Sequence, residues 1–535
     1  MRTRQTHAVL AVAALLALTA CTSSVTGTAG ADGSGPAGAG GSVPAAGGTA
    51  TGAVPVGLET FYSQAISWGP CDSYATTADD ASLYADSAFD CARVQVPLDY
   101  ADPSRKTISV AVLRIKASGS RIGSLLVDPG GPGGSGMSLA ANLKSAVAGT
   151  PIGKRFDLVG FDPRGIGASE PAVDCVTNAE ADANRADIDL DTSPAGVAKT
   201  ESTQKAYADL CATRVGIDVL KHVGTVDAAQ DMDVLRSVLG DEKLSYLGYS
   251  YGTSLGTAYA EKFPTNVRAL VLDGALDPAA DPVETLVRQG QGFQGAFDAF
   301  AADCATTASC PLGRDPARAS AAFQALVRPL IKAAARTNDP RGLGYDDAVT
   351  GTVQALYSKQ LWPALTKGLS QLKSGQGDTL LALADLYQGR DANGNYSHEQ
   401  DGFNAVRCVD TPPTTDRTVV DTADARYRQA APFLDDGLGS GHAPLDVCAF
   451  WPVPPTRTPH TPSVKGVPQV VVISTTGDPA TPYQAGVQLA AQLGARLVTF
   501  RGNQHTVALS GVPCIDDAVG AYFVDLTVPV QGLTC

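Results

Sequence analysis

The sequence lacks the long basic and apolar runs that mark several classes of protein. Lys and Arg number 40 against 54 Asp and Glu, for a formal net charge of −14. Nucleic-acid binding needs clustered Lys and Arg, so we expect no nucleic-acid partner. After the N-terminus no apolar run is long enough to cross a bilayer as a helix. With 44% hydrophobic and 18% charged residues, the 535 residues are typical of a globular protein with more than one structural unit.

Closely spaced Cys and His ligands are also absent. There is no CxxC pair, so we expect no metal site. The chain nevertheless has 11 cysteines, and ten remain when Cys21 is set aside. An even number is typical of disulfides in an oxidising compartment, although sequence does not fix the connectivity. Our hypothesis is pairing between near neighbours: Cys71–Cys91, Cys175–Cys211, Cys304–Cys310, Cys408–Cys448 and Cys514–Cys535.

The N-terminal segment indicates export. Basic residues precede the apolar stretch AVLAVAALLALTA (8–20), whose length suits a signal peptide rather than a membrane-spanning helix. The stretch ends in LTAC, which resembles a bacterial lipobox with Cys21 as the lipidated residue; the alternative is an ordinary signal peptide. Residues 21–56 are mainly Gly, Ala, Ser and Thr, a composition typical of a flexible tether. We expect an extracytoplasmic protein that contacts the membrane only through its lipid anchor.

Strand-like and helix-like segments alternate after the tether. Apolar runs that predict strands end at turns, which favours a mostly parallel central sheet with helices on both faces. The segment 278–445 interrupts this pattern with Ala- and Leu-rich helical spacing. We therefore expect a core formed by 57–277 and 446–535, with a helical cap (278–445) inserted between its halves. The expected strands are 91–100, 107–117, 122–130, 155–165, 243–250, 267–274, 467–478 and 495–500.

One serine lies between two glycines at the end of an expected strand. Gly248-Tyr249-Ser250-Tyr251-Gly252 fits G-x-S-x-G, and it lies between a strand and an expected helix, as that motif requires. Larger side chains at either glycine would collide with the backbone of the sharp turn. The helix N-terminus beneath the serine favours developing negative charge. The pattern predicts Ser250 as a nucleophile; the alternative is a turn that is merely tight.

A serine nucleophile needs a general base, and few histidines are available. Where this motif occurs in catalysis, the acid and then the histidine follow the serine in the chain. His222 precedes Ser250, and His398 and His442 fall in the helical insertion. His505 follows the last expected strand in the loop TFRGNQHT, so it is the predicted base.

Two aspartates follow strands and compete for the acid position. Asp478 ends the strongly apolar strand VVVISTTGD, where it would orient His505 and stabilise the imidazolium. Asp273 ends the previous strand in LVLDG. We favour Asp478 and expect Asp273 to hydrogen-bond within the sheet edge.

The glycine-rich loop DPGGPGGSG (128–136) follows the third strand, where backbone N–H groups form an oxyanion hole in enzymes with this motif. The N–H groups of Gly131 and Tyr251 are the candidates. The same loop also fits G-x-G-x-x-G, the pattern of a dinucleotide site. Pro132 stiffens the loop, and an exported protein would rarely meet NAD, so we do not favour a nucleotide cofactor.

The motifs GGPGGSG, FDPRGIGASEP, GYSYGTSLG, LVLDG and TTGDPATP, followed by a late histidine, together resemble α/β-hydrolases of the proline iminopeptidase type. The resemblance extends over about residues 60–535 and is strongest to secreted bacterial tripeptidyl aminopeptidases. It implies a serine exopeptidase that acts on free N-termini through an acyl-enzyme without a cofactor. Ser250, Asp478 and His505 would be its triad.

The resemblance also implies that the cap binds the α-amino group of a peptide through carboxylates, for which Asp410 is the candidate. Two positions depart from the pattern: Asp128 precedes the glycine pair where relatives often carry His or Asn, and Gln504 precedes His505 where many have Gly. An esterase or lipase with the same triad, and a binding protein that retains the fold without turnover, remain alternatives.

Overall fold

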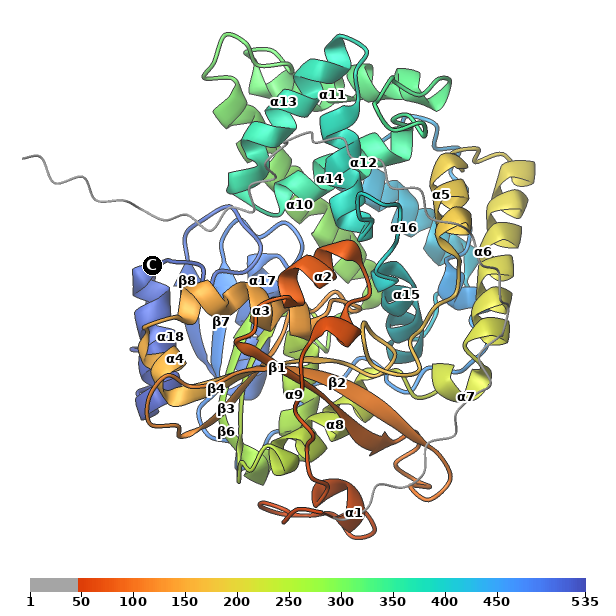
Figure 1. Cartoon of the computed structure of the whole chain (residues 1–535). Coiled ribbons are helices and arrows are strands. Elements are labelled where there is room, and N and C mark those ends of the chain that lie inside the picture. Colours follow the sequence, from red (N-terminus) through yellow and green to blue (C-terminus); the bar gives the residue numbers. More distant parts are fainter. Residues whose placement is uncertain (1–46) are drawn as a thin grey trace, which may run out of the picture.

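The structure is a computed structural model that describes residues 47–535; the predicted signal peptide and Cys21 lie outside the described residues. At its centre is one sheet with the strand order β1-β2-β4-β3-β5-β6-β7-β8 (Figure 1). Every strand expected from the sequence is present. The strands are β1 (Phe89–Pro97), β2 (Thr107–Ile115), β3 (Gly123–Asp128), β4 (Phe156–Asp162), β5 (Leu244–Tyr249), β6 (Val267–Asp273), β7 (Val471–Thr475) and β8 (Arg496–Phe500).

The sheet is mostly parallel, as predicted. β1 and β2 form an antiparallel hairpin, and β2 also pairs antiparallel with β4. All other neighbours are parallel. The carboxyl ends of β3, β5, β6, β7 and β8 therefore meet at one edge of the sheet, which is where ligands bind in such folds.

Helices cover both faces because the buried strands alternate their side chains. Leu126 packs into one core with α8 (Thr225–Val238), α9 (Gly252–Lys262) and α17 (Tyr483–Leu493). Leu125 and Val127 point the other way, into a second core. That core contains residues of α2 (Ala78–Tyr84), α3 (Gly136–Val147), α4 (Pro151–Arg155) and α18 (Pro513–Asp525).

A third core lies in the helical segment between β6 and β7. Phe293, Phe297 and Phe300 recur at helical spacing and pack together with Phe323 and Phe433. Figure 1 shows α10 to α14 beyond the sheet edge where the parallel strands end. The helices are α10 (Pro282–Cys304), α11 (Ala319–Val327), α12 (Tyr345–Leu356), α13 (Trp362–Lys373), α14 (Asp378–Gln388), α15 (Glu399–Asp410) and α16 (Arg417–Ala430). The domain limits proposed from sequence remain predictions.

A further helical excursion, between β4 and α8, was not anticipated from the sequence. It carries α5 (Asn178–Ala186), α6 (Pro194–Arg214) and α7 (Ile217–Leu220). Arg185 of α5 pairs with Asp347 of α12 at 2.8 Å and with Asp385 of α14 at 2.7 Å. These partly buried ion pairs join the excursion to the cap helices.

The described end of the expected tether lies against the core. Gly48 N–H donates to the carbonyl of Ser63 (2.7 Å), and the carbonyl of Thr51 accepts from Arg236 Nη1 (2.8 Å). Residues 47–56 therefore contact the segment around α1 (Glu59–Tyr62) and α8. The expected tether, 21–56, includes a segment that the core positions.

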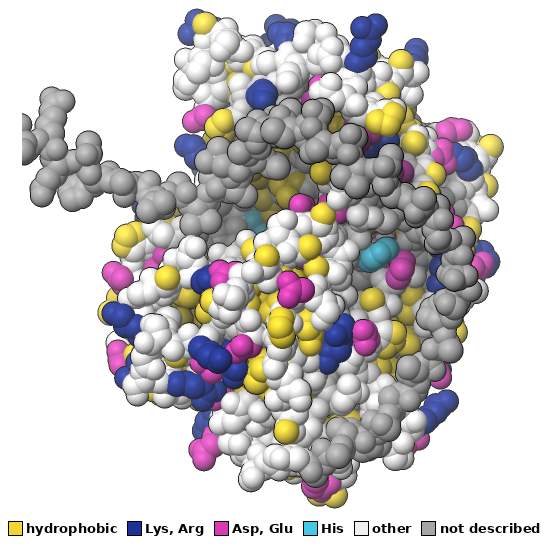
Figure 2. Space-filling view, in the orientation of Figure 1, with side chains coloured by type: hydrophobic (Ala, Val, Ile, Leu, Met, Phe, Trp, Pro, Cys, Tyr) yellow, Lys and Arg dark blue, Asp and Glu magenta, His cyan; other side chains and the backbone are white. Residues whose placement is uncertain are grey.

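All five near-neighbour disulfides are present, so the predicted pairing is confirmed. Among residues 47–535, every helix is too short or too polar to span a bilayer. On the face shown in Figure 2, acidic and basic side chains intermingle outside the grey atoms.

Candidate active site

Ser250 occupies a strained turn between β5 and α9. Its φ is +53°, a left-handed value that is costly for a residue with a side chain and is typical of a functional turn. The flanking glycines are needed sterically, since a Cβ at Gly248 would lie 2.4 Å from the carbonyl oxygen of Gly252. The Ser250 N–H donates to the carbonyl of Asp273 (2.9 Å), which fixes the turn at the end of β6.

The two predicted oxyanion donors lie at adjacent backbone segments. A Cβ at Gly130 would lie 2.7 Å from the Tyr251 nitrogen, so the glycine-rich loop closely approaches the residue after the nucleophile. Gly130 N–H is already bonded to Asp128 Oδ1 (2.9 Å). The N–H groups of Gly131 and Tyr251 have no acceptor among the described residues. Both N–H groups are therefore free to donate to an oxyanion.

Asp478 and His505 form the pair expected of a catalytic acid and base. His505 Nδ1 lies 2.9 Å from Asp478 Oδ1 and 3.0 Å from Oδ2, so Nδ1 donates and Nε2 is left as the acceptor. Asp478 Oδ1 also accepts the N–H groups of Ala480 (3.0 Å) and Thr481 (2.9 Å). Burial opposes the charged imidazole, but the Asp478 charge and hydrogen bond outweigh it and raise the pKa of His505.

Asp273, the competing acid, holds the loop that follows His505. Its Oδ2 accepts the N–H groups of Val507 (2.7 Å) and Ala508 (2.6 Å). Burial raises the pKa of Asp273 to about 6 despite these two bonds. Asp273 does not contact the His505 ring through a hydrogen bond, so the geometry favours Asp478 as the orienting acid.

The cap contacts the histidine loop directly. The carbonyl of Tyr357 accepts His505 N–H at 2.8 Å, and Ser358 forms an isolated bridge with Gln504. The Tyr357 ring also meets the imidazole edge to face, with centroids 5.4 Å apart. Gln504, which stands where many relatives have Gly before the histidine, thus lies where the cap contacts the loop that carries His505. Among the described residues no hydrogen bond joins Ser250 Oγ to His505; catalytic hydrogen bonds often tighten only when substrate binds.

Asp410, the carboxylate expected to bind substrate, is linked to the Tyr251 side chain through Thr225. Its Oδ1 accepts Thr225 N–H (2.9 Å), and its Oδ2 accepts the Thr225 hydroxyl. That hydroxyl also lies 2.6 Å from the Tyr251 hydroxyl. The carboxylate is therefore occupied by Thr225 of α8, and the Thr225 hydroxyl links it to Tyr251, the residue after the nucleophile.

Glu399 is a carboxylate at the site that the sequence did not single out. It is the first residue of α15. A Cβ added at Gly134, in the glycine-rich loop (128–136, also called the oxyanion loop), would lie 3.6 Å from Glu399 Oε1. The side chain is half-buried and has no hydrogen bond or ion pair among the described residues. Burial raises its pKa to about 7. No local motif surrounds Glu399, so only the position of α15 reveals it.

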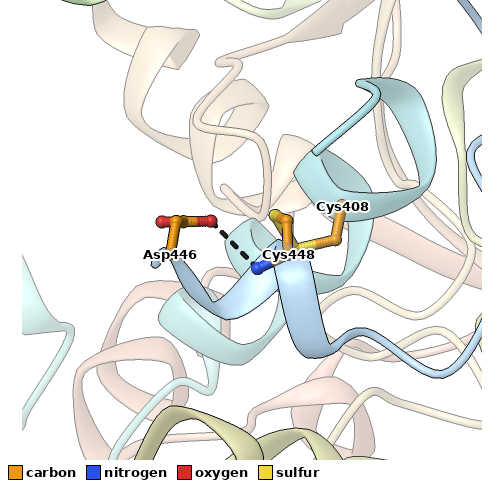
Figure 3. Close-up of side chains that lie close together, drawn as sticks. All are labelled: Cys408, Asp446 and Cys448. Atoms are coloured by element: carbon orange, nitrogen blue, oxygen red, sulfur yellow. Dashed lines mark hydrogen bonds between the residues drawn. A yellow bond between two sulfur atoms is a disulfide. The ribbon is translucent and has the colours of Figure 1, made fainter. Parts of the chain in front are cut away.

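Other clusters of potential ligands have structural partners. Cys408 and Cys448 lie with Asp446, but their sulfurs form a disulfide, and Asp446 Oδ1 accepts Cys448 N–H at 2.9 Å (Figure 3). Beside Asp174 and His398, Asp401 accepts hydrogen bonds from Cys175 N–H and the Tyr207 hydroxyl.

The dinucleotide alternative for the glycine-rich loop conflicts with the contacts at α3. Asp162 Oδ1 accepts the Met137 N–H (3.1 Å) in the first turn of this helix, where a dinucleotide site would place phosphate.

The Ser250 turn between β5 and α9, the Asp478–His505 pair and the strand order together define an α/β-hydrolase. The family described as the alpha/beta hydrolase fold matches residues 123–512, and the chain belongs to this family. It is 49% identical over 479 residues to the serine protease Hip1 of Mycobacterium tuberculosis, with 88% of this chain and 91% of the relative aligned. It is 50% identical over 471 residues to a protein named carboxylesterase B from the same species, with 88% and 89% aligned. It is 34% identical over 461 residues to the tripeptidyl aminopeptidase of Streptomyces lividans, with 83% of each chain aligned.

Proposed function

We propose that the protein is a serine aminopeptidase that cleaves short peptides from free N-termini through an acyl-enzyme. The strained Ser250 turn and the Asp478–His505 pair supply a nucleophile, a base and an orienting acid. Relatives named as a serine protease and as a tripeptidyl aminopeptidase support a peptide substrate.

The proposed steps use only side chains and backbone of this chain. His505 Nε2 takes the proton from Ser250 Oγ as the oxygen attacks the scissile carbonyl, and Asp478 stabilises the imidazolium. The N–H groups of Gly131 and Tyr251 donate to the oxyanion. His505 then protonates the leaving amine, and water, deprotonated by the same imidazole, hydrolyses the acyl-enzyme.

The observation that carries the aminopeptidase assignment is the unpaired carboxylate of Glu399 beside the oxyanion loop. A peptide's α-ammonium is a cation that such a carboxylate would bind through a charge-assisted hydrogen bond. Because burial raises the pKa of Glu399 to about 7, an arriving cation would favour its ionised form and strengthen the pairing. Glu399 thus replaces Asp410 as our candidate for reading the N-terminus.

The decisive experiment compares a fluorogenic tripeptide with a free amine against the same tripeptide N-acetylated, using the purified protein and Ser250→Ala as the blank. We expect cleavage of the free form alone. Glu399→Gln should raise KM for the free peptide by about 10- to 100-fold while kcat changes less, because it removes a charge-assisted contact. Asp410→Asn is the matched control and should keep both the wild-type KM for the free peptide and the wild-type preference for it over the acetylated one, because Asp410 is bonded to Thr225. Equal cleavage of both peptides by the wild type would show that the amine is not read.

An esterase is the second candidate, favoured by the relative named carboxylesterase B. The same triad attacks acyl esters, and the fold does not decide the substrate. Rapid ester turnover without cleavage of the free-amine peptide would establish it. Failure of Ser250 to react with any serine-directed phosphonate would instead favour a protein that has kept the fold without turnover.

We further propose that the protein is exported and anchored through lipidated Cys21. The support is the sequence motif ahead of the tether. Metabolic labelling with a tagged fatty acid should mark the wild type and not Cys21→Ala, and the variant should be recovered from the medium rather than from the membrane fraction. Equal labelling of both forms would contradict the anchor.

A further inference from the structure

Asp128, the last residue of β3, is a buried carboxyl that the proposed catalytic steps do not use. Its exposed fraction is 1%. Oδ1 accepts the N–H of Gly130 at 2.9 Å, whereas Oδ2 is buried without a hydrogen-bond partner among the described residues. Buried polar groups are nearly always paired, so an orphaned carboxyl oxygen calls for an explanation.

The Asp128 carboxyl touches the backbone on both sides of the proposed oxyanion hole. On one side it bonds Gly130, the neighbour of Gly131. On the other side, a Cβ at Gly252, the residue after Tyr251, would lie 2.9 Å from Oδ1. The two candidate donors therefore belong to residues whose immediate neighbours pack on this one carboxyl.

Within residues 47–535, the groups that face Asp128 offer no positive charge to balance an ionised carboxylate. Asp162 lies on the neighbouring β4, Tyr246 on β5, and Tyr251 in the turn before α9. Beyond the loop, Glu399 of the cap lies beside Gly134, and Asp410 of the same helix acts on Tyr251. Burial, and to a lesser degree the charge of Asp162, raise the pKa of Asp128 to about 8. A negative charge in this position would oppose the negative charge that develops on the substrate oxygen.

We propose that Asp128 is a positioning residue: in its uncharged form it holds the oxyanion loop through the Gly130 N–H, and its ionisation disables the oxyanion hole. The effect reaches the substrate through Gly131 and Tyr251, not through direct contact. This inference rests on the proposed serine hydrolase chemistry but not on recognition of a peptide amine.

An activated ester such as p-nitrophenyl butyrate tests the proposal, because it has no amine that titrates. For the full chain, kcat/KM is measured from about pH 6 to pH 10, and we expect an alkaline fall with a midpoint near the raised pKa. Asp128→Asn keeps an acceptor for Gly130 and cannot ionise. It should abolish the fall while keeping kcat at neutral pH within about threefold.

Two further variants separate positioning from general packing. Asp128→Ala removes the bond to Gly130 and should lower kcat at neutral pH at least about tenfold, with KM changed less than about twofold. Asp241→Asn is the matched control: Asp241 is a buried acid that accepts Ser124 N–H (2.9 Å) at the opposite end of β3. This variant should keep the alkaline fall.

The proposal is overturned if Asp128→Asn retains the fall at the same midpoint, if the wild type has no fall, or if Asp128→Ala keeps the wild-type kcat. If Asp128→Ala does not fold, the pH profile of Asp128→Asn decides alone. Turnover of the ester without cleavage of any free-amine peptide would refute the peptidase assignment and leave this test intact.

Discussion

Replacing Asp478 and Asp273 separately by asparagine distinguishes the two acids that compete for the catalytic role. In Asp478→Asn, the amide oxygen can still accept the N–H groups of Ala480 and Thr481. The amide NH2, in place of Oδ2, would face His505 Nδ1 at 3.0 Å and favour the tautomer in which Nδ1 accepts, although the retained oxygen also lies 2.9 Å from Nδ1. In that tautomer the imidazole carries its proton on Nε2, where it cannot accept the proton of Ser250.

The contacts of the two carboxylates set the loss of kcat expected in each variant. Loss of the correct tautomer in Asp478→Asn should lower kcat by about 10³- to 10⁴-fold, which corresponds to about 4–5.5 kcal/mol of transition-state stabilisation. In Asp273→Asn, the amide oxygen can keep the bonds to Val507 and Ala508, and the NH2 replaces an oxygen that has no partner. We expect kcat within about tenfold of the wild type, because the loop that carries His505 is retained.

The assay is kcat on one activated ester and one free-amine tripeptide, with thermal unfolding of both variants as the control for folding. A larger loss for Asp273→Asn than for Asp478→Asn, with both proteins folded, would refute the assignment of the acid. Equal losses would show that the two carboxylates act as a unit.

Three further predictions concern pH and stability. The acid limb of kcat/KM should have its midpoint above 6.5, because Asp478 raises the pKa of His505 and only the neutral imidazole accepts the serine proton; in Asp478→Ala the midpoint should move down, and an unchanged pH profile would contradict the pairing. Arg164→Met should lower the free energy of unfolding in urea by about 3–5 kcal/mol, because it removes the cation that donates to the buried Asp231 carboxylate at 2.6 and 2.7 Å. A loss below about 1 kcal/mol would show that the Asp231 charge is neutralised or stabilised without Arg164. Replacing both cysteines of the 408–448 pair by serine should lower the free energy of unfolding by about 4 kcal/mol, and the 304–310 pair by only about 2 kcal/mol. The reason is that the sequence separations are 40 and 6 residues, and a disulfide that closes a longer loop restricts the unfolded chain more. Denaturation midpoints in the opposite order would contradict this dependence on loop length.

The triad candidates could be predicted because each follows an apolar strand. Ser250, Asp478 and His505 come after β5, β7 and β8, and the carboxyl ends of parallel strands share one edge of a sheet. Local sequence was sufficient for this step, since short apolar runs that end in turns identify strands. The excursion was missed because its two longer helices, α5 and α6, have few strongly apolar positions. Arg185 of α5 is instead paired with Asp347 of the cap.

The carboxylate beside the oxyanion loop could not be predicted from sequence for a different reason. Glu399 and Asp410 are the first and last residues of α15, and both lie in a segment that sequence assigns to the cap. Asp410 points to α8 and Glu399 to the glycine-rich loop. Which end of a helix faces a site depends on the docking of the whole helix, and no residue near either carboxylate encodes it.

The glycine-rich loop shows why one motif permitted two interpretations. A Cβ at Gly130 would lie 2.5 Å from the carbonyl oxygen of Tyr249, one at Gly133 2.4 Å from that of Glu399, and one at Gly136 2.0 Å from that of Phe161. The three glycines thus serve three separate close approaches: to the nucleophile turn, to the cap and to the sheet. The dinucleotide pattern begins one residue later, at Gly131, and shares only Gly133 and Gly136 with these approaches. Because α15 of the cap packs on the loop that contains Gly131, a shift of α15 would displace the proposed oxyanion donor as well as Glu399.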